Sequence, residues 1–162
     1  MLPYIVVTQS LIFQKNTWMT KNELRKKYKE ERKKLTKTDI ENLSLQIANQ
    51  ILKLPIWEYN NYHIFLPIEK QNEIDTENII HILLGRDKNV IISKSNFDDN
   101  SMTHYLLTDN TKIEINSYGI PEPTTGFKVD DKELDVVFVP LLAFDRLGNR
   151  VGYGKDFHLI VI

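Results

Sequence analysis

Two glycines and two cationic side chains stand close together near the end of this 162-residue sequence. Arg150, Gly152, Gly154 and Lys155 follow Leu134–Phe144, an apolar stretch that predicts a buried strand. Glycine lets the backbone approach phosphate oxygens closely, and a lysine charge contributes about 4 kcal/mol at ~4 Å for an effective dielectric of ~20. The pattern indicates a phosphate site. The tetrapeptide Gly-Tyr-Gly-Lys is also common in ordinary turns, so from these residues alone both interpretations stay open.

The place of this turn in the fold follows from the strand before it. Leu134–Phe144 is apolar on both faces, as in a central parallel strand that is covered on each side. In an open α/β sheet, ligands bind beyond the carboxyl ends of the strands. We therefore expect the glycine-rich turn at that edge. Asp145 ends the same strand, where it either orients the loop or simply forms a turn.

Helices and strands alternate along the rest of the chain. Two capping boxes, Thr20 with Glu23 and Thr38 with Glu41, predict the starts of the first two helices. We expect helices over residues 20–35, 38–54 and 76–84 and strands over residues 62–68, 89–93, 102–107 and 134–144. This alternation predicts an α/β fold, specifically a three-layer α/β/α domain with a mostly parallel central sheet.

The first expected helix is strongly basic, with eight Lys or Arg against three Glu between Lys21 and Lys34. Most of these cations are expected on a solvated face. Lys21 and Arg25 are considered separately, because their i, i+4 spacing places them on one side of the first turn.

Composition narrows the classes of partner. The formal net charge is −1 at pH 7, so no global field draws the chain to nucleic acid or to an anionic membrane. The absence of cysteine excludes disulfides and thiolate metal sites. The histidines His63, His81, His104 and His158 lack the spacing of metal ligands, so we expect no metal site from them. We expect a cytoplasmic monomer whose partners are small molecules.

Residues 1–18 are expected to lie outside the domain. Their uncharged run ends after 14 residues at Lys15, which is short for a membrane span, and it lacks the basic start of a signal peptide. Met19 directly precedes the first capping box. We therefore expect an N-terminal extension, with Met19 as an alternative start, rather than a genuine first strand.

Four segments together resemble the 5-formyltetrahydrofolate cyclo-ligase family, whose members are also called methenyltetrahydrofolate synthetases. In chain order they are KNELR, FLPIEKQNEIDT, YGIPEP and VPLLAFDRLGNRVGYGK. Their order and spacing match from about Met19 to Lys155. The last segment is long and specific, whereas the first alone would mean nothing.

The resemblance implies an ATP- and Mg²⁺-dependent enzyme that converts 5-formyltetrahydrofolate, polyglutamylated or not, into 5,10-methenyltetrahydrofolate with release of ADP and phosphate. It implies that ATP is bound by Lys21, Arg25, Arg150, Gly152, Gly154 and Lys155, and that Arg150 and Lys155 are the catalytic cations. It implies that the folate substrate is bound by Leu66, Glu73, Tyr153 and Phe157.

The match breaks near the end of the sequence. Asp156 stands where the family has a glycine that meets phosphate, and Leu159 stands where it has a magnesium-binding carboxylate, so no metal ligand is assigned. We expect residues 19–162 to form a truncated or frameshifted member whose C-terminal elements are missing. The alternatives left open are a noncatalytic remnant that binds nucleotide or folate weakly or not at all, and another phosphate-ligand enzyme such as a sugar-phosphate isomerase.

Overall fold

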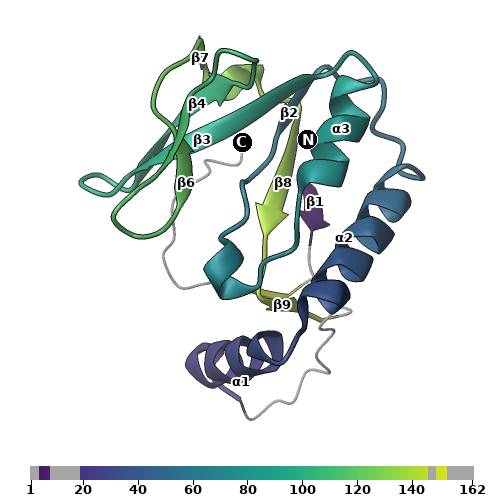
Figure 1. Ribbon diagram of the computed structural model, residues 1–162, viewed down its shortest axis with the longest axis vertical. Helices are drawn as coiled ribbons and strands as arrows, with labels where there is room; N and C mark the ends of the chain where they lie inside the picture. The colour runs from purple at the N-terminus through teal and green to yellow at the C-terminus, as the bar shows by residue number, and fades with distance from the viewer. Residues whose placement is uncertain (1–3, 8–18, 146–148, 153–162) are drawn as a thin grey trace.

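The structure is a computed structural model that describes residues 4–7, 19–145 and 149–152 (Figure 1). Its helices are α1 (Lys21–Lys33), α2 (Lys37–Ile51) and α3 (Glu77–Leu84), with short 3-10 helices η1 (Glu69–Gln71) and η2 (Asp131–Glu133). Its strands are β1 (Tyr4–Val7), β2 (Asn61–His63), β3 (Asn89–Asn96), β4 (Ser101–Leu106), β5 (Ile113–Ile115), β6 (Pro121–Pro123), β7 (Lys128–Val129), β8 (Val136–Pro140), β9 (Ala143–Phe144) and β10 (Arg150–Val151).

Six strands form the central sheet, in the order β1-β8-β2-β3-β4-β7. The first four of these run parallel to one another, whereas β4 is antiparallel to β3 and β7 is antiparallel to β4. Two antiparallel pairs, β9 with β10 and β5 with β6, lie outside this sheet. The prediction of an α/β fold with a mostly parallel central sheet is confirmed.

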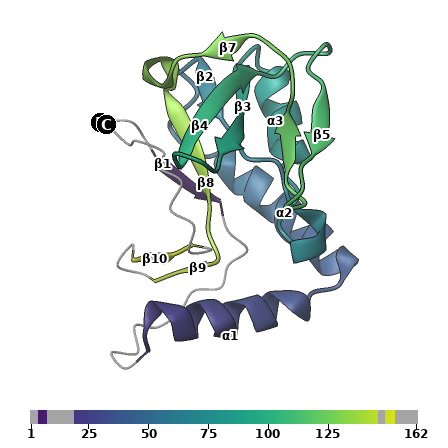
Figure 2. The ribbon, with the colours of Figure 1, turned by 90° about the vertical axis from the view of Figure 1, so that its left-hand side faces the viewer.

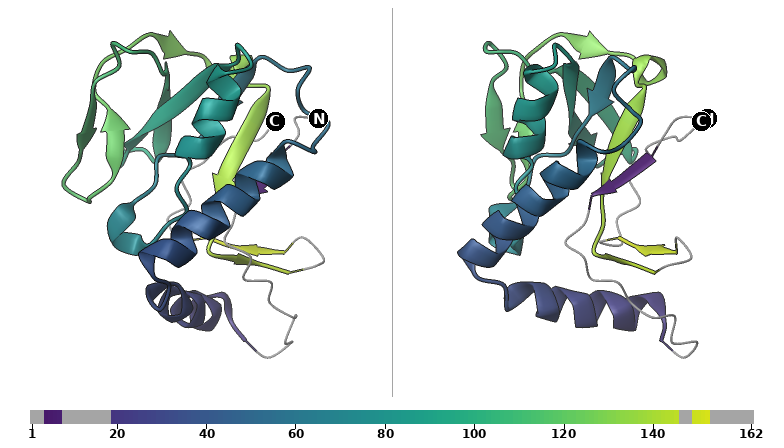
Figure 3. Two further views of the ribbon diagram at one scale, coloured as in Figure 1. Left: turned by 45° about the vertical axis from the view of Figure 1, so that its right-hand side comes forward. Right: turned by 90° about the vertical axis from the view of Figure 1, so that its right-hand side faces the viewer.

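Helices α2 and α3 cover one face of the sheet (Figure 3). Between them and the sheet lies the main apolar core, in which Tyr62 and Phe138 stack at 6.4 Å and pack with Ile79 and Leu83. A smaller cluster around Ile91, Leu134 and Val137 is separate from this core. Helix α1 instead lies across the carboxyl ends of the central strands (Figure 2). Of the three expected layers, the described residues thus supply two, the sheet and one helical layer.

Part of the segment that was expected to lie outside the domain forms a strand. Tyr4–Val7 pairs in parallel with β8, from Tyr4 opposite Val137 to Val7 opposite Pro140. The expectation of an extension rather than a first strand is wrong for these residues. The physical reason is that β8 has a second edge beside the one that β2 pairs with, and backbone groups there need partners.

The capping box of α2 lies two residues before the predicted one. The Thr36 side chain accepts a hydrogen bond from the Asp39 backbone N–H, and the Asp39 carboxylate accepts one from the Thr36 N–H at 2.9 Å. The predicted pair, Thr38 and Glu41, therefore lies inside the helix. An aspartate at the third helical position serves the box as well as a glutamate, and the earlier start lengthens the helix by about half a turn.

Two expected strands are shorter in the structure. The strand expected over residues 62–68 stays in the sheet only as Asn61–His63, and the one expected over residues 134–144 ends at Pro140. Beyond Pro140 the chain leaves the sheet and forms the hairpin of β9 and β10. Proline has no N–H for a ladder hydrogen bond, which accounts for the break in an otherwise apolar run.

Candidate functional site

The hairpin of β9 and β10 lies between α1 and the carboxyl end of β8 (Figure 2). Its buried side chains Leu142, Ala143 and Val151 pack against Tyr28 and Leu24 of α1. This apolar contact fixes the helix over the strand end. It places the basic first turn of α1 next to the glycine-rich segment.

A hydrogen bond joins two residues that were predicted to bind the same ligand. The Arg25 guanidinium donates from Nε to the carbonyl oxygen of Gly152 at 3.1 Å, and its Nη1 donates to Asn22 Oδ1 at 2.7 Å. Lys21, at the start of the same helix, and Arg150, two residues before the glycine, are both exposed. The Arg25 contact therefore joins the start of α1 to the hairpin.

Gly152 has open space where a side chain would be. A Cβ atom built there would meet no atom of the described residues within 4 Å, and its backbone is not in the left-handed region. The fold itself therefore does not require glycine at this position.

Asp145 holds the hairpin closed. Its carboxylate accepts hydrogen bonds from the Asn149 backbone N–H at 2.8 Å and from the Asn149 side-chain amide at 2.7 Å. The Asp145 N–H donates in return to the Asn149 carbonyl at 2.9 Å. Of the two roles left open for this residue, the structure supports the formation of the turn.

Glu73 lies on the loop that follows β2, near the same end of the sheet. Only 8% of it is exposed, and its Oε2 accepts a hydrogen bond from the Ile68 N–H at 2.7 Å. Oε1 is 3.9 Å from Nη1 of Arg32. Burial raises the pKa of the Glu73 carboxyl above its ordinary value, and the Ile68 N–H and the Arg32 charge oppose that rise.

The family model of 5-formyltetrahydrofolate cyclo-ligases matches residues 17–159. A Schizosaccharomyces pombe protein named for this activity is 31% identical over 145 residues, which cover 86% of this chain and 70% of that protein. The 5-formyltetrahydrofolate cyclo-ligases of Mus musculus and Haemophilus influenzae are 32% and 34% identical.

Solved structures give the same result. The 5,10-methenyltetrahydrofolate synthetase of Aquifex aeolicus has a TM-score of 0.71 and 28% identity, and the match covers 86% of this chain and 70% of that one. The synthetase of Mycoplasma pneumoniae, at 19% identity and a TM-score of 0.63, shares the fold. The chain belongs to the 5-formyltetrahydrofolate cyclo-ligase family. The resemblance of its four segments is confirmed, and the family is one of ATP-dependent ligases of folate metabolism.

The chain spans only part of the cyclo-ligases that it matches. The region matched to the mouse enzyme is 61% of this chain and 52% of that enzyme. The region matched to the Haemophilus enzyme is 59% of this chain and 53% of that enzyme. The family match starts at residue 17, so β1 lies before the matched region.

The predicted cyclo-ligase residues fall into three groups. The structure brings Arg25 into contact with Gly152, with Arg150 two residues earlier on the hairpin and Lys21 four residues earlier on α1. Leu66 is half-buried against the main apolar core, on the loop that also carries Glu73. The remaining predicted residues, Tyr153, Gly154, Lys155 and Phe157, lie outside the described residues, as do Asp156 and Leu159.

The prediction missed Arg32, which is 5% exposed although it belongs to the basic helix. The sequence does contain a signal for it. Arg32 follows Tyr28 by four residues and Leu24 by eight, so it continues the apolar stripe of α1. A cation on that stripe is buried, unlike its neighbours Lys33 and Lys34.

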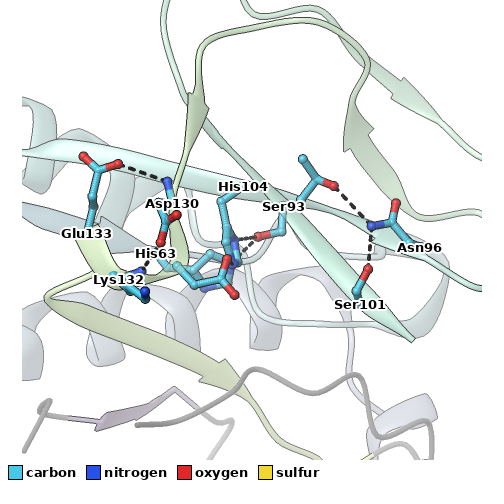
Figure 4. A network of polar contacts seen from close by, with 10 residues as sticks. His63, Ser93, Asn96, Ser101, His104, Asp130, Lys132 and Glu133 are labelled. Atoms are coloured by element: carbon cyan, nitrogen blue, oxygen red, sulfur yellow. Dashed lines mark hydrogen bonds and ion pairs between the residues drawn. The ribbon is translucent and has the colours of Figure 1, made fainter. Parts of the chain in front are cut away.

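A second group of residues that the prediction did not connect lies across β2, β3 and β4 (Figure 4). His63 Nε2 and His104 Nδ1 both contact Ser93 Oγ, at 2.6 and 2.5 Å, and His104 Nε2 is 3.3 Å from the Asp131 carboxylate. Both histidines are 3% exposed. They are buried histidines of the sheet, as expected for core positions.

One pattern of protons satisfies this network. The Asp131 carboxylate can only accept, so Nε2 of His104 carries a proton and Nδ1 accepts from the Ser93 hydroxyl, which in turn accepts from Nε2 of His63. Both rings are then neutral. Burial lowers the pKa of His63 to about 3, with a smaller contribution from His104, and burial also lowers the pKa of His104 against the opposing Asp131 charge.

Proposed function

We propose that this protein converts 5-formyltetrahydrofolate to 5,10-methenyltetrahydrofolate with consumption of ATP and release of ADP and phosphate. The observation that carries the proposal is the contact of Arg25 with the Gly152 carbonyl. It joins the cationic start of α1 to the glycine-rich hairpin beyond the carboxyl end of β8, where α/β proteins bind ligands. Glu73 lies on the neighbouring loop, on the side proposed for folate.

The proposed chemistry starts at the formyl group. Its oxygen attacks the γ-phosphorus of ATP, the bond from phosphorus to the bridging oxygen breaks, and ADP leaves. The other nitrogen of the folate then attacks the activated carbon and releases its proton to solvent, the ring closes, and phosphate departs with the former formyl oxygen. No protein nucleophile is needed. Lys21, Arg25, Arg150 and Lys155 neutralise the charge that develops on the phosphate oxygens.

The glycines are proposed to assist phosphoryl transfer because they have no side chain that would obstruct the phosphate. At Gly152 the open space allows phosphate oxygens to approach the backbone, and Gly154 is proposed to do the same. The Asp145–Asn149 hydrogen bonds support this role because they fix the hairpin before any ligand arrives.

Glu73 is proposed to bind the folate. A carboxylate accepts hydrogen bonds, and a reduced pterin presents adjacent N–H donors. Oε2 is engaged by the Ile68 N–H, whereas Oε1 faces Arg32 at a distance too long for a hydrogen bond. Leu66, Tyr153 and Phe157 are proposed to line the same substrate site.

Magnesium enters the proposal as the ion that accompanies ATP. Among the residues that the structure describes, no group of three or more His, Asp or Glu could hold a metal. Asp145, the carboxylate nearest the hairpin, is engaged by Asn149. These residues do not fit a protein-bound magnesium, so we assign no step to one.

We further infer that the protein works as a cytoplasmic monomer that also accepts polyglutamylated folates. The lack of cysteine and the near-neutral net charge support this setting. No helix within the described ranges has the length and apolar character of a membrane span. Light scattering after size exclusion tests the monomer, and a series of glutamate-tailed substrates tests the second inference.

The test of the proposed activity follows the near-ultraviolet absorbance of methenyltetrahydrofolate after mixing with Mg·ATP and 5-formyltetrahydrofolate. Lys155→Ala should abolish ring closure while the melting temperature stays within a few degrees. Lys128→Ala, which removes an exposed lysine of β7, is the matched control and should retain full activity. Unchanged turnover in Lys155→Ala refutes the assignment, and ligand binding without turnover in the wild type supports the noncatalytic alternative.

A further inference from the structure

Arg32 links the two sides of the proposed site. Its guanidinium donates from Nη2 to the carbonyl oxygen of Leu141 at 3.0 Å, the residue directly after β8. Its Nη1 lies 3.9 Å from Glu73 Oε1, and its own backbone carbonyl accepts a hydrogen bond from the Asn72 side chain at 3.2 Å. One residue of α1 thus contacts the start of the hairpin segment and the loop of Glu73.

Hydrogen bonds from Asn72 also hold the Glu73 loop against α1. Asn72 adopts a left-handed conformation with φ of 51°, and its side-chain amide donates to the carbonyls of both Arg32 and Leu35. Arg32 lies in the last turn of α1 and Leu35 two residues beyond its end, so Asn72 fastens the loop to the C-terminal end of the helix. The sharp turn at Asn72 therefore brings Glu73 back toward the buried guanidinium.

Burial strengthens the electrostatic interaction between Arg32 and Glu73. Both side chains are less than a tenth exposed, so water screens their interaction weakly. At 3.9 Å the interaction is an ion pair without a hydrogen bond, which leaves lone pairs of Oε1 for another donor. Arg32 thus favours the charged form of Glu73 without occupying its second oxygen.

We propose that Arg32 is a positioning residue for folate binding: anchored on the Leu141 carbonyl, it holds the Glu73 carboxylate ionised and oriented toward the substrate. The inference rests on the proposed function, because it deepens the role given there to Glu73. It assigns a specific task to one cation of α1 that touches neither ATP nor the reacting atoms.

The test compares Arg32→Met with wild type in three measurements. The KM for 5-formyltetrahydrofolate should rise about tenfold, while the KM for ATP changes less than twofold. The pH midpoint of folate binding should move upward. A carbon-13 NMR titration of the Glu73 carboxyl, without any ligand, should show a higher pKa than in wild type, because the opposing Arg32 charge is gone.

Two variants complete the design. Lys33→Met removes a neighbouring exposed charge of α1 and should change none of the three measurements. Arg32→Lys retains the charge, but an ammonium cannot reach Leu141 and Glu73 in the same forked geometry, so it should restore the folate KM only in part. It also keeps the test decisive if Arg32→Met fails to fold.

The outcomes separate this inference from the proposed function. If wild type turns over folate and both Arg32 variants keep its folate KM, the positioning role is overturned while the activity stands. If wild type neither binds nor converts folate, the proposed function fails. The ligand-free titration then decides alone: a raised Glu73 pKa in Arg32→Met supports the electrostatic role of Arg32, and an unchanged one overturns it.

Discussion

The guanidinium of Arg25 donates a hydrogen bond to the carbonyl of Gly152, although the two residues are 127 positions apart in the chain. This bond is part-buried and charge-assisted, which makes it stronger than a typical surface contact. It turns two separate sequence motifs into one surface at the carboxyl end of β8. The first two predictions concern its two partners.

Replacement of Arg25 by Gln should weaken nucleotide binding and the fold together. The loss of a charged hydrogen bond should lower the free energy of unfolding by about 2 kcal/mol, and ATP affinity should fall by about tenfold. Urea unfolding and calorimetric titration with an ATP analogue measure the two effects. Lys26→Gln, at the next and exposed position, should alter neither. Equal ATP affinity in both variants would remove Arg25 from the site.

Gly152→Ala should separate ligand binding from stability. Because a Cβ meets none of the described atoms within 4 Å, the melting temperature should stay within about 2 °C, whereas ATP affinity should fall at least tenfold. The control is Gly119→Ala, at a φ of 79°, which should lower stability by about 1 kcal/mol and leave ATP binding unchanged. Wild-type ATP affinity in Gly152→Ala would contradict the proposed approach of phosphate.

Arg32→Met should destabilise the fold in a pH-dependent way. At neutral pH it leaves the buried Glu73 charge uncompensated, with an expected loss of about 3 kcal/mol. A carboxyl with a raised folded-state pKa contributes stability below its unfolded value, here 4.5, and loses that contribution as the pH rises through the folded value. The difference from wild type should therefore shrink as the pH falls toward 4.5. Urea unfolding at pH 7.5, 6 and 4.5 measures this difference. A loss of stability that is the same at all three pH values would argue against the ion pair.

The histidine network should make the fold sensitive to acid. The pKa of His63 is lowered from 6.5 to about 3, so the unfolded chain takes up a proton that the folded chain refuses within this window. Stability is present above pH 6.5 and decreases as the pH falls, by about 1.4 kcal/mol per pH unit for this residue. His104 acts in the same direction.

His63→Gln tests this slope because an amide can still donate to Ser93 but does not titrate. The free energy of unfolding should depend on pH less steeply between 6.5 and 4 in this variant than in wild type. His81→Gln, on the exposed face of α3, should leave the slope unchanged. Identical slopes for wild type and His63→Gln would show that His63 is not held neutral.

The sequence was sufficient for the fold class and for the family, because those rest on local patterns. Alternation of apolar segments indicates the sheet, and four motifs carry the family. The start of α2 was wrong because Thr36 with Asp39 and Thr38 with Glu41 form overlapping boxes of nearly equal merit. Local sequence offers no means to choose between them.

The remaining misses concern contacts that depend on tertiary structure. Ser93 lies opposite His104 only through the register of β3 and β4, and no spacing in the sequence encodes that pairing. Arg32 is one of eight cations between Lys21 and Lys34. Its place on the apolar stripe was available, but its partners Leu141 and Glu73 come from distant segments that only the fold brings together.

The pairing of Tyr4–Val7 with β8 has a consequence for handling the protein. In a chain that starts at Met19, none of the described residues would pair with this side of β8, and its amide and carbonyl groups could accept a strand from another molecule. Such a side is a template for intermolecular β-pairing and aggregation. These four residues precede the region shared with the family. By pairing with β8, they should therefore reduce self-association through that strand.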